Sequence, residues 1–330
     1  MANIERKNLA ASRSLLAGDD VLADLLRWTS EGRKAALVTL VTIDGATPRP
    51  LGAQMAVCED GSYAGYLSGG CLEQAVADEA LCVLREGKNR LFRFGKGSAY
   101  FDLKLPCGSG LDLYFDQGLT REVLKRVAEL RKARTALWLE TDLEIGSSQV
   151  VEAAPEVTPR SEKLASTFRR AVLPLPRMLL AGGGPAFVAI AQLMAVTGFE
   201  IDVLSPDDNA RWAIEGLGVA TRGLTDASAV DVAGLDRWSA AVVAFHDHDW
   251  EAPVLAAILK TDCFFIGVMG SKAAHDNRLG RLAGMGVCTS NQQRLRSPVG
   301  LIPGAKSRLT LAAGVVAEVV AQAKAAGLLD

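Results

Sequence analysis

Apolar strands and helices alternate strictly over residues 177–330, and this pattern constrains the fold more than any other feature. The strands are apolar along both faces, as a buried parallel sheet requires, and each is followed by a segment with helical spacing. Strands are predicted over 177–181, 199–204, 240–245 and 262–268, and helices over 185–197, around 209–216, between the last two strands and over 307–324. This half of the chain is therefore predicted to be a Rossmann-type, doubly wound α/β domain.

The first half of the chain has a mixed pattern, which predicts a smaller α+β domain. A hairpin is expected over 53–66, with its turn at Asp60-Gly61. The other predicted elements are helices over 20–31, 71–86 and 120–132 and strands over 34–43, 90–94, 110–116 and 135–140. Four prolines and many charges over 152–176 predict a connector with at most one short helix. The predicted division is thus a domain over 1–155, a linker over 156–176 and a domain over 177–330.

Composition narrows the class of protein. A net charge of −2 leaves no basic surplus for phosphate backbones, so nucleic acid is not expected as a partner. Charged residues interrupt every apolar stretch near the N-terminus, so neither a signal peptide nor a membrane span is predicted. We expect a cytoplasmic protein whose six cysteines are buried or reactive thiols rather than disulfides.

The turn after the first strand of the second half is a triple glycine, Gly182, Gly183 and Gly184. Such a turn aims backbone N–H groups and a helix N-terminus at an anion, although it can also be only a tight turn of the fold. A dinucleotide fingerprint would need a small residue where Phe187 stands and a carboxylate where Ser205 ends the second strand. The loop therefore favours a phosphate-bearing ligand over NAD.

Two further loops follow strands of this domain, at the edge where open α/β sheets bind ligands. The first carries His246, Asp247 and His248. In extended chain the two imidazoles would point the same way, as a metal site requires, but no third metal ligand has suitable spacing. A loop that contacts a ligand is therefore favoured over a metal site. The second is either an anion cradle or an ordinary capped turn, and its polar and small residues are Gly267, Gly270, Ser271 and Lys272. A third loop, 297–304, is stiff and rich in glycine, and no more follows from it.

In the first half, two cysteines lie in glycine-rich loops, where a buried structural thiol is less expected than elsewhere. Cys71 is predicted in the first turn of a helix, where N–H groups and the dipole favour a nucleophilic thiolate that binds soft metals. Cys107 lies within a Pro-Cys-Gly-Ser-Gly loop. The residues around the first cysteine are Ser68, Gly69, Gly70 and Glu73. Arg49, in the stiff loop 47–52, suits an anionic group or lies in a solvated turn.

Taken together, the motifs resemble the XdhC/CoxI family, the accessory proteins of xanthine dehydrogenase and related molybdenum hydroxylases. The Ser-Gly-Gly-Cys-x-Glu and Ile-Gly-x-x-Gly-Ser stretches are specific when they occur in one chain. The similar segments are residues 44–55, 60–73, 106–110, 182–184, 245–251, 265–279 and 297–305. Three positions depart from the usual family pattern, namely Pro185, Ser205-Pro206-Asp207 and Gly300-Leu301-Ile302.

The resemblance implies a chaperone without turnover of its own. Such a protein binds molybdenum cofactor, protects it during sulfuration and inserts it into an apo-hydroxylase. It also implies a cysteine desulfurase as a partner and a homodimer, and it makes Cys71 and Cys107 candidate molybdenum ligands. The candidate cofactor-binding residues are then those singled out in these loops: Arg49, Ser68, Gly69, Gly70, Cys71, Glu73, Cys107, Gly182, Gly183, Gly184, His246, Asp247, His248, Gly267, Gly270, Ser271 and Lys272. An NAD(P)-dependent oxidoreductase and a scaffold that only bridges the desulfurase and the hydroxylase remain alternatives.

Overall fold

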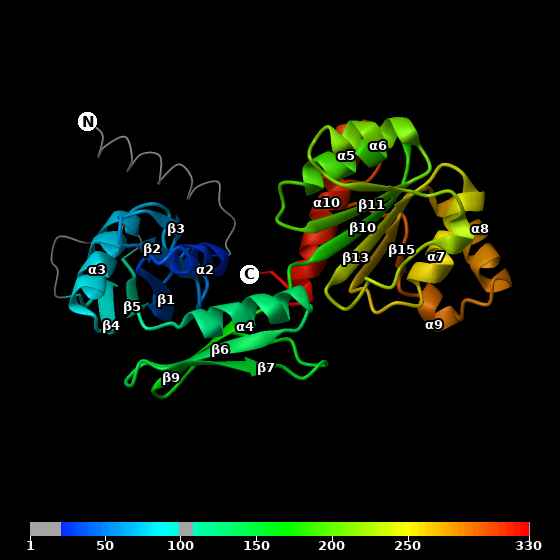
Figure 1. The fold of residues 1–330 in the computed structure, drawn as a ribbon. Coiled ribbons are helices and arrows are strands. Elements are labelled where there is room, and N and C mark those ends of the chain that lie inside the picture. Colours follow the sequence, from blue (N-terminus) through cyan, green and yellow to red (C-terminus); the bar gives the residue numbers. More distant parts are fainter. Residues whose placement is uncertain (1–20, 99–107, 330) are drawn as a thin grey trace. The chain divides into compact units, whose positions relative to one another are not determined.

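The computed structural model describes residues 21–98 and 108–329. These residues form two compact units, which divide between Pro174 and Leu175 (Figure 1). Each unit has its own apolar core and is described by itself. Among the described residues, none of the helices is long and apolar enough to cross a membrane.

The first unit is built on a five-stranded antiparallel sheet with the order β3-β2-β1-β5-β4. Its strands are β1 (Ala35–Asp44), β2 (Gln54–Cys58), β3 (Tyr63–Gly65), β4 (Arg90–Gly95) and β5 (Gly110–Asp116). Alternate residues of β1 enter two different cores: Val38 and Leu40 pack with helix α3 (Glu73–Glu86), whereas Leu37 packs on the opposite face. This central strand is therefore buried on both faces, as its run of β-branched and aliphatic residues requires.

The opposite face of that sheet packs against helices α2 (Leu22–Ser30) and α4 (Arg121–Lys132) and a second sheet. The second sheet has the order β7-β6-β9-β8. Its strands are β6 (Leu137–Asp142), β7 (Ser148–Glu152), β8 (Glu162–Leu164) and β9 (Thr167–Val172). Strands β8 and β9 lie inside the stretch predicted as a connector, and β9 pairs with β6 along its whole length. The expectation of a connector with at most one short helix was therefore wrong.

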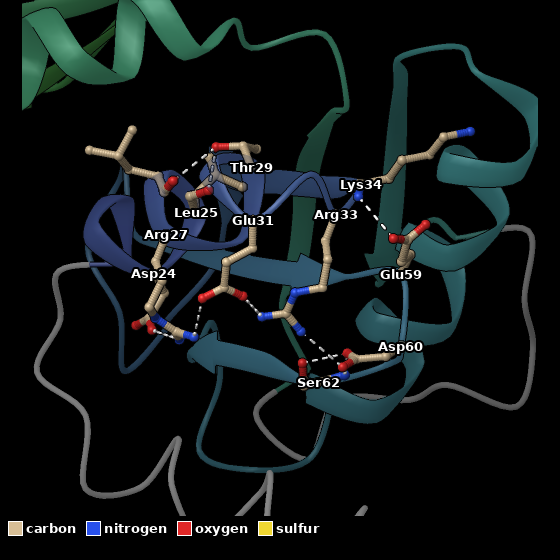
Figure 2. A network of polar contacts seen from close by, with 11 residues as sticks. Asp24, Leu25, Arg27, Thr29, Glu31, Arg33, Lys34, Glu59, Asp60 and Ser62 are labelled. Atoms are coloured by element: carbon tan, nitrogen blue, oxygen red, sulfur yellow. Dashed lines mark hydrogen bonds and ion pairs between the residues drawn. The ribbon is translucent and has the colours of Figure 1, made fainter.

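The predicted hairpin over 53–66 is confirmed, and a charged network holds its turn. Gly61 adopts a φ of +83° at the turn, which favours glycine. Figure 2 shows Arg33 bridging two carboxylates, with nitrogen–oxygen distances of 2.8 Å to Glu31 and 3.1 Å to Asp60. Asp60 also accepts hydrogen bonds from the backbone and side chain of Ser62. This network is partly exposed and joins α2 to the hairpin, so its role is structural.

The second unit is a six-stranded parallel sheet, which confirms the predicted Rossmann-type fold. The strands are β10 (Arg177–Gly182), β11 (Glu200–Ser205), β12 (Thr221–Gly223), β13 (Ser239–Ala244), β14 (Phe265–Val268) and β15 (Leu295–Arg296). Their order in the sheet is β12-β11-β10-β13-β14-β15. The chain adds β11 and β12 on one side of β10 and then β13, β14 and β15 on its other side. Open α/β sheets bind ligands at such a switch point.

Helices cover both faces of this sheet (Figure 1). One face is covered by α5 (Gly184–Met194), α6 (Asp208–Glu215) and α10 (Arg308–Ala325). The other is covered by α7 (His248–Ile258) and α8 (Lys272–Gly284), with the short helices η1 (Ala227–Ala229) and α9 (Thr289–Gln292) in the connections. Because the strands are parallel, the loops that follow β10, β11, β13, β14 and β15 all leave the sheet at the same edge.

Candidate functional site

Strand pairing brings the motif loops of the first unit to one end of its sheet. The last residue of β1, Asp44, pairs with the first residue of β5, Gly110, and the last residue of β3, Gly65, pairs with Met55 near the start of β2. The loops over 45–53 and 66–72, together with the described residues 96–98 and 108–109, therefore lie at the same end of the sheet. The turn network of Figure 2 lies at the opposite end, because Ala35, at the start of β1, pairs with Cys58, at the end of β2.

Glu73, a predicted cofactor-binding residue, is instead directed into its own loop. Its side chain is buried, and the residue is only 6% exposed. Its carboxylate accepts hydrogen bonds from the backbone N–H groups of Leu67 at 3.0 Å, Ser68 at 2.8 Å and Leu72 at 3.2 Å. The Ser68 hydroxyl donates to the same carboxylate at 2.9 Å. Glu73 thus holds both ends of the loop.

The loop keeps the Glu73 carboxylate ionised. Burial alone raises the pKa of Glu73, but hydrogen bonds from the backbone and hydroxyl of Ser68 and the backbone of Leu67 lower it by more. The resulting pKa lies below the ordinary value for glutamate. A fixed negative charge therefore lies beneath the loop.

Cys71 is exposed on this loop, and its surroundings differ from the prediction. Helix α3 begins at Glu73, so Cys71 precedes the helix and does not lie in its first turn. Its backbone N–H donates to the Ser68 hydroxyl oxygen at 3.2 Å, and its Sγ lies 3.4 Å from the same oxygen. A Cβ atom at Gly69 or Gly70 would meet no atom within 4 Å beyond its chain neighbours, so the space beside these two glycines is open.

Arg49 and Tyr66 form a stacked pair beside this loop. The Arg49 guanidinium carbon lies 4.2 Å from the centre of the Tyr66 ring, and Nη1 donates to the tyrosine hydroxyl at 3.0 Å. Sequence reasoning singled out Arg49 but not Tyr66. The position of an aromatic residue directly before the Leu-Ser-Gly-Gly-Cys stretch is the signal that could have identified it.

The loop that carries Arg49 also contacts the described end of the Pro-Cys-Gly-Ser-Gly motif. The Ser109 hydroxyl donates to the backbone carbonyl of Ala46. A Cβ atom at Gly45 would lie 2.9 Å from the Ser109 Oγ, so glycine permits this approach. Cys107 lies outside the described residues. The three N-terminal motifs therefore meet as far as their described residues extend.

In the second unit, the glycine loop forms a tight turn between β10 and α5. A Cβ atom at Gly182 would overlap the carbonyl oxygen of Ala244, so only glycine fits against β13. Helix α5 begins at Gly184 with Gly183 as its N-cap. Phe187, which stands at the third small position of the dinucleotide fingerprint, is fully buried in the core beneath the loop.

A carboxylate does reach this loop, although it comes two residues after β11. Asp207 caps α6 by accepting hydrogen bonds from the N–H groups of Asn209 and Ala210. Its second oxygen accepts from the Gly184 N–H at 3.3 Å, and its own N–H donates to the hydroxyl oxygen of the buried Ser205 at 3.1 Å. A phosphate at this N–H would have to compete with the Asp207 carboxylate.

Of the histidine pair, one side chain is placed at the same edge. The Nε2 atom of His246 would lie 3.6 Å from a Cβ atom at Gly184. Asp247 caps α7, and His248 is the first residue of that helix, so the pair is not in extended chain as predicted. Over residues 21–98 and 108–329, no group of three His, Cys, Asp or Glu side chains is arranged to hold a metal ion.

The residues of the predicted second cradle have separate roles. Gly267 lies within β14, where a Cβ atom would be 2.7 Å from the side chain of Val299, so it serves sheet packing. Ser271 caps α8 by accepting from the Ala274 N–H at 3.2 Å, and Lys272 is the exposed first residue of that helix. Gly270 has a φ of +136°. The capped-turn alternative describes these contacts.

A buried ion pair, which sequence reasoning missed, holds this edge of the sheet together. Arg278 on α8 donates to the two carboxylate oxygens of Glu251 on α7 at 2.7 and 3.0 Å, and both residues are 2% exposed. The same guanidinium donates to the Ser297 hydroxyl and to the carbonyl of Met269, each at 2.9 Å. One side chain thus joins helix α7 to the loops that follow β14 and β15.

Comparison with known proteins gives matches along most of the chain. Residues 28–95 match the XdhC and CoxI family, and residues 178–319 match the XdhC Rossmann domain. The molybdenum cofactor insertion chaperone PaoD of Escherichia coli is 35% identical over 89% of this chain and 86% of its own length. A protein of Bacillus subtilis named as a probable subunit of xanthine dehydrogenase is 26% identical over 87% of this chain and 92% of its own length.

A crystal structure described as that of a xanthine dehydrogenase from Bacillus halodurans has a similar fold. Its TM-score is 0.74 at 20% sequence identity, and the match covers 93% of this chain and 96% of the other. At this identity the likeness concerns the fold alone.

Proposed function

This chain belongs to the XdhC and CoxI family, and we propose that it binds molybdenum cofactor and inserts it into a xanthine-dehydrogenase-type molybdenum hydroxylase. The observation that carries the proposal is the exposed thiol of Cys71 on a loop held from below by Glu73. A thiolate is a preferred ligand for a soft, sulfur-bound metal centre, and an exposed loop allows the cargo to be received and released.

In this proposal the protein acts as a chaperone and performs no turnover. It takes up the cofactor, protects it while a cysteine desulfurase supplies the terminal sulfur, and hands it to the apo-hydroxylase. A homodimer and a cytoplasmic location belong to the same proposal. The relative with 35% identity, named as an insertion chaperone, supports this function over that of a scaffold with empty loops.

The thiol role predicts a loss of cargo when the sulfur is removed. In protein co-expressed with its client, Cys71→Ala is expected to lower the retained molybdenum per chain at least about tenfold, the scale on which loss of a metal-site group acts. Cys107→Ala is expected to act in the same direction. Native mass spectrometry for bound molybdopterin, together with elemental analysis for molybdenum, measures the effect.

The matched control is Cys288→Ala, which removes an exposed cysteine from the second unit and should leave molybdenum retention unchanged. Retention at the wild-type level in both the Cys71 and the Cys107 variants would exclude the proposed thiol role. Absence of molybdopterin from the wild-type protein would exclude the carrier function itself.

A second candidate, an NAD(P)-dependent oxidoreductase, is favoured by one observation in the second unit. The Asp207 carboxylate lies at the glycine loop, where dinucleotide-binding folds place the group that accepts a ribose hydroxyl. The Bacillus subtilis relative, whose name places it in a dehydrogenase, is consistent with this candidate. Phe187 at the third small position of the fingerprint weighs against it.

This candidate predicts saturable binding of NAD or NADP that depends on Asp207. Asp207→Asn preserves the helix cap and removes the charge, so it should weaken nucleotide binding about tenfold without unfolding the domain. Isothermal titration measures both affinities. If no heat of binding is detected at millimolar nucleotide, the oxidoreductase is excluded and the carrier function remains.

A further inference from the structure

Tyr66 has a ring that is held in place and is also partly exposed. Its ring is held by a stacked arginine, with the Arg49 guanidinium carbon 4.2 Å from the ring centre and a 3.0 Å hydrogen bond to the tyrosine hydroxyl. The residue nevertheless remains 37% exposed. The ring is therefore fixed in orientation while part of its surface faces solvent, which is how an aromatic side chain receives a flat ligand.

The position of the ring links it to the thiol. Tyr66 precedes Leu67, whose N–H is bound by one oxygen of Glu73, and Cys71 precedes Leu72, whose N–H is bound by the other oxygen. Both ends of the exposed loop therefore converge on a single carboxylate. This closure brings Tyr66 and Cys71 to the two ends of one short loop, at the same end of the sheet as Arg49.

We infer that Tyr66 and Arg49 bind the pterin part of the cargo, with the pterin ring stacked on the Tyr66 face opposite the Arg49 guanidinium and the guanidinium attracting the phosphate of the cargo. The inference rests on the proposed function and assigns a binding role to Tyr66. A pterin is a flat heteroaromatic ring system with carbonyl oxygens, and stacking on an aromatic side chain beside an arginine is the common way in which proteins bind such rings.

The division of labour follows from the chemistry of the two groups. Cys71 offers a soft sulfur to the metal end of the cargo, and the Arg49–Tyr66 pair offers a flat, cationic surface to its organic end. A metal-free pterin should therefore bind to the pair and be indifferent to the thiol. This separates the inference from the proposed function experimentally.

The test uses an oxidised, metal-free pterin as the probe and follows quenching of its fluorescence by the full-length protein. Tyr66→Leu removes the ring and is expected to raise the dissociation constant about tenfold, which is within the range for loss of one stacking contact. Tyr66→Phe keeps the ring and should change it less than about threefold. Arg49→Lys is expected to weaken binding by an intermediate factor, because the planar donor is lost.

Two controls keep the outcomes distinct. Leu91→Ala removes an exposed apolar side chain of β4 outside the loops and should not affect the pterin titration. Cys71→Ser should bind the metal-free pterin as the wild type does. Thermal unfolding of each variant verifies that the fold is intact.

The inference is overturned if the wild-type protein does not quench the pterin up to its solubility limit, or if Tyr66→Leu binds as tightly as the wild type. If molybdenum is retained through Cys71 while Tyr66→Leu has no effect, the proposed function holds and this inference fails. If pterin binding depends on Tyr66 while the protein retains no molybdenum, the proposed function fails and the inferred pterin-binding role of Tyr66 stands.

Discussion

Replacing Arg278 with methionine is expected to lower the free energy of unfolding by about 3–5 kcal/mol, because the change removes the arginine that pairs with the buried Glu251 carboxylate. The Ser297 hydroxyl and the Met269 carbonyl lose a donor in the same step. Urea denaturation followed by circular dichroism at neutral pH measures the loss. We expect Arg278→Met to be among the most destabilising single substitutions in the second unit.

The chain offers a matched control for this prediction. Arg281 and Asp249 pair across the same two helices at 3.2 Å, but their side chains are 51% and 88% exposed. Arg281→Met should therefore change stability by less than about 1 kcal/mol, the usual range for a surface ion pair. A double variant, Arg278→Met with Glu251→Leu, leaves neither charge buried alone and should be more stable than Arg278→Met. Equal losses at Arg278 and Arg281 would contradict the buried-pair argument.

The fold of the second unit could be predicted because its determinants are local in sequence. Each of the four predicted strands is an apolar run bounded by turn residues, and the apolar residues of each helix recur with helical spacing. The two short strands that the prediction missed, β12 and β15, contain only Thr221–Gly223 and Leu295–Arg296, too few residues to show any period.

The hairpin of β8 and β9 was missed for a different physical reason. Glu162–Leu164 is exposed along its whole length, and Arg169 and Arg170 interrupt β9, so the segment has the charges and prolines of a connector. Its strand structure depends on pairing with β6, whose residues lie 25 to 35 positions before their partners in β9. Tertiary pairing of this kind cannot be detected from local composition.

In the candidate site, too, residues with a local signal in the sequence could be predicted, and residues that depend on distant contacts could not. Cys71 was identified because a cysteine among glycines is locally unusual, and it is exposed as a ligand-binding thiol must be. The role of Glu73 could not be deduced, because a carboxylate that binds cargo and one that binds its own loop have the same sequence. Arg278 and Tyr66 depend on partners far away in sequence, at Glu251 and Arg49.

Removing the Glu73 carboxylate is expected to be the most damaging change in the first unit. Glu73→Ala leaves the N–H groups of Leu67 and Ser68 without their acceptor and removes one of the two acceptors of the Leu72 N–H, and each hydrogen bond to a charged acceptor contributes about 1.5–3 kcal/mol. Because the opened loop can be hydrated, we expect a net loss of about 2–4 kcal/mol rather than the full sum. Urea denaturation measures this loss.

The same change should reduce molybdenum retention by about tenfold or more, because Ser68 and Cys71 lose their fixed positions. Glu73→Asp keeps the charge and should recover part of both losses, whereas an apolar replacement should recover neither. Glu86→Ala is the matched control: it lies on the same helix, its side chain is 51% exposed, and it should cost less than about 1 kcal/mol with no effect on molybdenum. If Glu73→Ala instead retained the cargo while losing stability, Glu73 would support only the fold, and the position of Cys71 would not depend on it.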